Sequence, residues 1–126
     1  MNSNYSLKRF YGMGSRAGDY FISLNKSGFT ISAGFCIEEK IKDFSKCIMY
    51  FDTAKKAVGF QFVNGNNVKG AFKVVHTNNG ASASISPRSF IKANHIDDSK
   101  YFGRKIPKKI SKEGLGEIFV IDLVKQ

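Results

Sequence analysis

The chain has no tryptophan and only two cysteines among its 126 residues. Two cysteines are too few for the disulfide framework of a small secreted domain. No apolar run approaches the roughly 20 residues that a membrane-spanning helix needs, and the N-terminus has no apolar signal-peptide core. We therefore expect a cytoplasmic protein that has no membrane partner.

Acidic residues are also scarce, because 10 Asp and Glu stand against 20 Lys and Arg, which gives a formal net charge of +10. A small domain this basic repels itself, and the usual compensation is a polyanionic partner. Nucleic acid is the first expectation, with DNA more expected than RNA. An acidic protein or membrane surface, or no polyanion at all, are the alternatives that the charge leaves open.

What the chain does contain favours β structure. It has 12 Phe, and 42% of its residues are hydrophobic, which is enough for one core. Residues 1–18 combine Asn, Ser and Gly with Lys8, Arg9 and Arg16, so we expect a flexible basic segment there. Residues 19–126 are expected to form a single domain.

The first half of that domain, about residues 20–63, changes periodicity twice. An Asn-Lys-Ser-Gly turn at 25–28 lies between two apolar runs and predicts a hairpin. Ser32 is placed to cap a short amphipathic helix, and two strands follow over 47–51 and 58–62. The predicted apolar stripe of the helix consists of Ala33, Cys36, Ile37, Ile41 and Phe44.

The second half, about residues 72–124, repeats this order. A strand over 71–76, a Thr-Asn-Asn-Gly turn and a strand over 81–85 predict a second hairpin. Ser86 is the expected N-cap of a helix that starts at Pro87 and ends near His95. This helix is expected to bury Phe90, Ile91 and either Asn94 or His95. Tyr101 and Phe102 open the next strand, a basic loop follows, and the last strand covers 117–124.

This repeated order predicts an α+β, β-rich fold. It consists of two pseudo-repeats, each made of a β-hairpin, a short helix and two strands, which together form one compact barrel-like domain. The connector at 64–70 is rich in Asn and Gly and is the expected boundary between the repeats.

The turn, strand and helix-start residues resemble the AbrB/MazE-type swapped-hairpin domain. The residues that carry the resemblance are Asn25-Lys26-Ser27-Gly28, Ile31-Ser32 and Ile85-Ser86-Pro87. The resemblance implies an interlocked β-barrel built from two units, as in tandem relatives of the MraZ type, and DNA binding through basic residues on one face. Two features depart from the family pattern: Phe29 replaces the usual Arg, and Asp43-Phe44-Ser45-Lys46 replaces the usual Gly-Asp.

The most concentrated basic stretch is KYFGRKIPKKISK at 100–112, which holds six cations and no carboxylate. A loop of this kind can lie along a phosphate backbone. Other turn and helix cations could extend the same patch. The predicted nucleic-acid-binding residues are Lys26, Lys55, Lys56, Arg88, Lys92, Lys100, Arg104, Lys105, Lys108, Lys109 and Lys112.

The sequence gives little support for metal binding or catalysis. Cys36, Cys47, His76 and His95 could nominally supply four zinc ligands, but they lack the closely spaced pairs of zinc sites, and His95 is expected to be a partly buried packing residue. No Gly-x-Ser-x-Gly, P-loop or His-Glu-x-x-His motif occurs. We therefore expect no catalytic residue, no metal and no cofactor.

These observations favour a nucleic-acid-binding protein, in particular a DNA-binding transcriptional regulator that grips the phosphate backbone with Lys and Arg loops. Phosphate contacts supply affinity but little sequence reading, and only four Arg are present for bidentate contacts with guanine. The alternative is a small non-enzymatic interaction module of a plasmid or phage type that docks on an acidic protein. A homodimer is compatible with either function.

Overall fold

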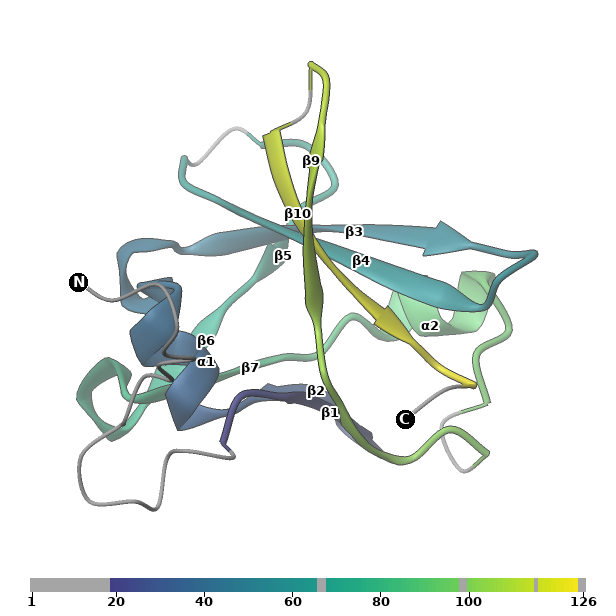
Figure 1. The fold of residues 1–126 in the computed structure, drawn as a ribbon, viewed down its shortest axis with the longest axis horizontal. Helices are drawn as coiled ribbons and strands as arrows, with labels where there is room; N and C mark the ends of the chain where they lie inside the picture. Colours follow the sequence, from purple (N-terminus) through teal and green to yellow (C-terminus); the bar gives the residue numbers. More distant parts are fainter. Residues whose placement is uncertain (1–18, 66–67, 98–99, 115, 125–126) are drawn as a thin grey trace, which may run out of the picture.

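The computed structural model describes residues 19–65, 68–97, 100–114 and 116–124, without the side chains of Asn78 and Lys112. The predicted flexible segment at 1–18 lies outside the described residues. The fold is β-rich, with two five-stranded antiparallel sheets and two short α-helices (Figure 1). No helix in the described ranges is long and apolar enough to cross a membrane.

The first sheet has the strand order β6-β7-β2-β1-β8. Its strands are β1 (Ile22–Asn25), β2 (Gly28–Ile31), β6 (Val75–Thr77), β7 (Ser82–Ile85) and β8 (Gly103–Lys105). The second sheet has the order β5-β3-β4-β10-β9. Its strands are β3 (Lys46–Asp52), β4 (Ala57–Val63), β5 (Phe72–Lys73), β9 (Lys108–Lys112) and β10 (Gly116–Asp122).

Each half of the chain gives one hairpin to each sheet. In the first sheet the hairpins β1–β2 and β6–β7 meet through the β2–β7 ladder. In the second sheet the hairpins β3–β4 and β9–β10 meet through the β4–β10 ladder. The helices α1 (Ala33–Glu38) and α2 (Arg88–Ala93) connect the hairpins and lie at opposite ends of the molecule (Figure 1).

The chain passes from one sheet to the other at two short bends. The predicted strand at 71–76 is divided at Val74, so β5 belongs to the second sheet and β6 to the first. The predicted basic loop is largely strand, because β8 and β9 are separated only by Ile106 and Pro107. The predicted barrel is not confirmed, since the two sheets are not closed into one.

Aromatic side chains fill the space between the two sheets. Phe29 of the first sheet packs edge-to-face on Phe60 of the second, with ring centroids 5.0 Å apart. Phe35 of α1 makes a similar contact with Phe119 of β10 at 4.8 Å. All four rings are buried, and edge-to-face pairs of this kind add to the free energy gained by burial. The Phe-rich composition is therefore used mainly to join the layers.

Helix α1 is shorter than the predicted apolar stripe. It ends at Glu38, Lys40 takes a left-handed conformation with φ of 55°, and a 3-10 helix η1 (Ile41–Asp43) follows. Ile37, which the stripe placed inside, is 47% exposed, whereas Phe35 is buried. Two other residues of the predicted stripe, Cys36 and Ile41, are buried as expected, so the stripe is right in part.

The predicted N-cap at Ser32 is confirmed. Its hydroxyl accepts hydrogen bonds from the backbone N–H groups of Phe35 (3.2 Å) and Phe21 (3.0 Å), and it donates to the carbonyl oxygen of Asp19 (2.8 Å). The Asp19 carboxylate in turn accepts from the Gly34 N–H at 3.1 Å. Through these hydrogen bonds Ser32 joins the start of α1 to the segment that enters β1. Ser32 is only 5% exposed, so the connection lies inside the protein.

The predicted N-cap at Ser86 is wrong by one residue. The Arg88 N–H donates to the Ser86 carbonyl (3.0 Å) around Pro87, whose φ of −87° and ψ of 66° are those of an inverse γ-turn. Helix α2 therefore begins at Arg88, and no side chain caps it. The helix also buries less than predicted. No α2 residue is fully buried, and Phe90 and Ile91 are only partly buried against the core.

We expect Ser32→Ala to lower the free energy of unfolding by about 1–2 kcal/mol, since it removes an N-cap and leaves buried N–H groups without a partner. Ser86→Ala is the matched control, because the sequence gives both serines the same place before a helix but Ser86 caps none. Urea denaturation measures both variants, and equal losses of stability would contradict this view of the two helix starts.

Candidate nucleic-acid interface

Three of the predicted cations meet at one hollow of about 500 Å³. Lys26 comes from the β1–β2 turn, and Arg88 and Lys92 come from α2 in the other half of the chain. All three side chains are exposed. The hollow is lined by Lys26, Ser27, Arg88, Ile91, Lys92, His95 and Ile96, a set that includes no carboxylate.

The β1–β2 turn is fixed in place against the start of α2. The Ser27 N–H donates to the Asn25 side-chain oxygen at 3.0 Å, which is an Asx-turn contact. Gly28 has a φ of +133°, and a Cβ there would lie 2.3 Å from the carbonyl oxygen of Ile85. Only glycine fits so close to the other half of the chain, so the approach of Lys26 to α2 depends on it.

Lys55 and Lys108 share a second hollow, of about 720 Å³, on the outer face of the second sheet. The carboxylates of Asp52 and Asp122 line the same hollow. The charges there are mixed, so this surface attracts a polyanion less strongly than the hollow at α2.

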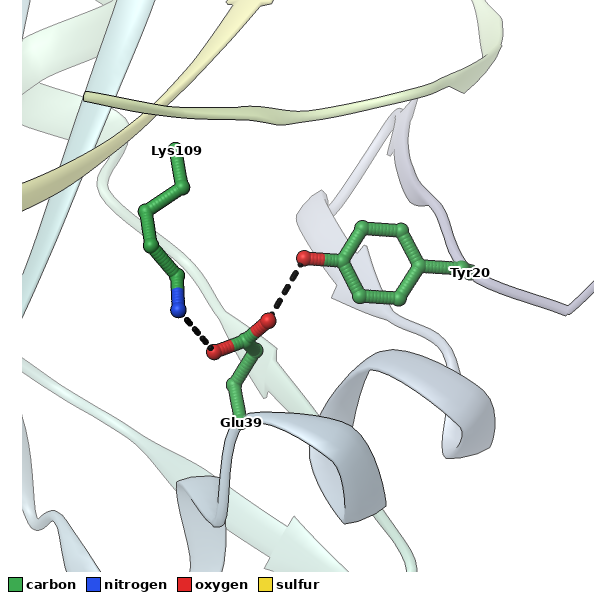
Figure 2. A network of polar contacts seen from close by, with 3 residues as sticks. All are labelled: Tyr20, Glu39 and Lys109. Carbon is green, nitrogen blue, oxygen red and sulfur yellow. Dashed lines mark hydrogen bonds and ion pairs between the residues drawn. The ribbon is translucent and has the colours of Figure 1, made fainter. Parts of the chain in front are cut away.

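Lys109 points to the opposite side of β9 from Lys108, because neighbouring residues of a strand face opposite ways. Its ammonium group lies 3.1 Å from Glu39 Oε1, and the Tyr20 hydroxyl donates to Glu39 Oε2 at 2.8 Å (Figure 2). The hydrogen bond and the charge of Glu39 raise the pKa of Lys109. Lys109 is therefore partly neutralised within the protein.

Lys105 does not belong to the exposed surface, contrary to the prediction. It lies directly opposite Ile22 in the β1–β8 ladder, and residues in register share a face of the sheet. Since Ile22 faces the core, Lys105 does too: it is 3% exposed, and its ammonium group donates to the Leu123 carbonyl at 3.1 Å. Lys105 joins the C-terminal end of β10 to the first sheet.

The other predicted cations lie apart from the two hollows. The Arg104 guanidinium stands 4.4 Å from the centroid of the Phe21 ring, and the Lys100 ammonium stands 5.4 Å from that of Tyr101. Lys56 is exposed in the β3–β4 turn with a left-handed φ of 55°. The side chain of Lys112 lies outside the described residues. The basic stretch at 100–112 therefore does not present its cations on one face.

The residues considered for a metal site are not gathered. Burial raises the pKa of both Cys36 and Cys47 to about 12, with a further contribution from the Asp19 charge at Cys36. His76 Nε2 lies 2.7 Å from the Phe44 carbonyl oxygen. Within the described ranges no group of His, Cys, Asp and Glu could hold a metal ion.

His95 is the residue at the α2 hollow that sequence reasoning missed. We expected it to be a partly buried packing residue, but it is exposed beside Lys92. The signal in the sequence is closeness, since His95 follows Lys92 by three residues, just beyond the helix that places Arg88 and Lys92 on one face.

No known protein family, curated protein or solved structure matches this chain. The resemblance to the AbrB/MazE-type domain therefore stays a prediction, and the charges and geometry of the chain itself carry the functional argument.

We expect Cys36 and Cys47 to resist a disulfide reagent at pH 8 in the folded protein, because a thiol with a pKa near 12 is almost fully protonated there. Both should react at once in denaturant. Fast labelling of the native protein would contradict the burial of these two thiols.

The raised pKa values also make stability depend on pH. The two thiols stabilise the folded protein fully below the ordinary thiol pKa, and this stabilisation falls as the pH rises above that value.

We expect Lys105→Ala to lower the free energy of unfolding by about 2 kcal/mol, since it removes a buried stem and the hydrogen bond to the Leu123 carbonyl. Lys108→Ala removes the same atoms from an exposed site on the next strand along the chain and should change stability by less than about 0.5 kcal/mol. Thermal and urea denaturation compare the two variants, and a larger effect at Lys108 would overturn the assignment.

Proposed function

We propose that this protein binds nucleic acid through the phosphate backbone, with DNA as the expected partner, in the role of a transcriptional regulator. The observation that carries the proposal is the net charge of +10 together with the exposure of most of the predicted cations. The exposed residues of that set are Lys26, Lys55, Lys56, Arg88, Lys92, Lys100, Arg104, Lys108 and Lys109.

The distribution of these cations favours binding by charge and shape over base reading. Only Arg88 and Arg104 among them are arginines, and bidentate contacts with guanine prefer that side chain. Lysine contacts with phosphate give affinity that is nearly independent of sequence. The cations lie in separate groups, and one of these, Lys26, Arg88 and Lys92, shares a hollow whose lining includes no carboxylate.

We further propose that the two halves of the domain are copies of one plan. Support comes from the order of hairpin, helix and hairpin, which occurs in both halves, and from the pairing of like hairpins in each sheet. The resemblance to the AbrB/MazE-type domain adds the expectation that a protein of this plan binds DNA. A duplicated scaffold would offer two related surfaces to a double helix.

A gel-shift series over salt concentration tests the function. If about six phosphates are neutralised, the logarithm of the binding constant should fall with the logarithm of salt at a slope of about −5. Lys56→Gln should reduce the size of that slope by about 1, and Thr53→Ala, an exposed uncharged change in the same turn, should leave it unaltered.

Duplex DNA, single-stranded DNA and RNA are compared in the same buffer. Tightest binding of duplex DNA is the expected result. Failure to bind any of the three at low salt would end the proposal, and a nuclease-insensitive complex with an acidic protein would favour the interaction-module alternative.

A further inference from the structure

The end of α2 holds His95 in a conformation that usually belongs to glycine. The Ile96 N–H donates to the Ile91 carbonyl at 3.0 Å, and the His95 N–H donates to the Lys92 carbonyl at 3.2 Å. These two bonds form a Schellman motif, in which the left-handed residue is His95 with a φ of 54°. A side chain costs some stability in this conformation, which Lys40 also adopts after α1.

The Schellman motif places His95 near two cations of α2. Arg88 stands in the first turn of the helix and Lys92 in the last, and His95 lies two residues past the end of the helix; all three line the same hollow. Lys26 approaches them from the β1–β2 turn. Four side chains that can donate to an anion therefore surround one space.

This arrangement is electrostatically unfavourable while it stands alone. Arg88 and Lys92 are like charges at a spacing of four residues, which destabilises a helix. Arg88 also lies at the N-terminal end of α2, where the helix dipole disfavours a cation. Asp97, the carboxylate that follows closely, accepts a hydrogen bond from the Lys100 N–H at 3.3 Å and does not line the hollow. An anion in the hollow would offset all of these costs.

We propose that this hollow is a discrete binding site for one phosphate group of a nucleic-acid strand, held by Lys26, Arg88, Lys92 and His95. The proposal rests on the proposed function and deepens it. Arg88 supplies a planar fork of donors that matches phosphate oxygens, and the two ammonium groups supply charge without a fixed geometry. Because the residues come from both halves of the chain, the site exists only in the folded protein.

The hollow has room for more than a bare phosphate. Its volume is about 500 Å³, and the apolar residues Ile91 and Ile96 are among those that line it. Ile96 is buried. The sugar attached to a backbone phosphate could rest on these isoleucines while the cations contact the phosphate oxygens. A phosphate seated in this way would fix the register of the strand on the protein.

The first experiment titrates the full chain with inorganic phosphate and follows backbone and side-chain resonances by NMR. Saturable shifts confined to the residues around the hollow are expected. The double variant Lys26→Gln, Lys92→Gln should weaken phosphate binding by about tenfold or more, since it removes two of the four donors and two positive charges. The matched control is Lys69→Gln, Lys73→Gln, which removes two exposed lysines elsewhere and should leave the phosphate affinity unchanged.

His95→Gly separates binding from folding. Glycine suits the left-handed position, so the variant should unfold at the same temperature as the parent or a higher one. It should nevertheless bind phosphate more weakly, because one donor is lost. A His95→Gly variant that keeps the full affinity for phosphate would remove His95 from the site.

DNA binding by the same variants distinguishes this inference from the proposed function. If the two double variants lose DNA affinity equally, and phosphate shifts are linear and spread over the surface, the hollow is not a site although the function stands. If phosphate binds saturably at the hollow but no nucleic acid binds, the function fails and the anion site stands. Selective loss of both phosphate and DNA affinity in the Lys26, Lys92 variant supports both.

Discussion

The contact between the inner faces of the two sheets is the constraint on which the rest of the structure depends. Phe29 and Phe60 meet edge-to-face across the centre, and Phe35 and Phe119 repeat the contact beside α1. Two short sheets without this interface would each expose one apolar face to water, and neither would be stable alone. The interface therefore determines which side of every strand is inside, and so which polar side chains face the solvent.

The same constraint explains the two bends that join the sheets. At Val74 and at Ile106-Pro107 the chain leaves one sheet and enters the other within one or two residues. Val74 is buried and its N–H donates to the Ser45 carbonyl at 3.0 Å, so the bend keeps its backbone hydrogen bonded. Pro107 is also buried and has no N–H to satisfy, which suits a residue between two ladders.

The distribution of charge follows from these bends. In the sequence the cations at 100–112 form one continuous run, and on that basis we expected one surface. In the fold the run crosses both sheets, and the alternation of each strand sends Lys105 inward, Lys108 to the outer face and Lys109 toward Glu39. The hollow with no carboxylate in its lining instead brings Arg88, Lys92 and His95 together with Lys26, which is distant from them in sequence.

Local signals in the sequence determined much of the fold. The β1–β2 hairpin, the cap at Ser32 and the paired strands β3 and β4 depend on residues close to one another, and their prediction is confirmed. The start of α2 was nearly right, and its error at Pro87 comes from a local turn that competes with the cap.

The net charge of +10 is likewise a property of the sequence alone, and it carries the functional argument. Only the tertiary structure decided which cations face the solvent together. The direction of a side chain in a strand depends on register and on which sheet the strand joins, and both are set by pairing with distant segments. Lys105 opposite Ile22 and Lys26 beside α2 are the results that no short-range pattern could have supplied.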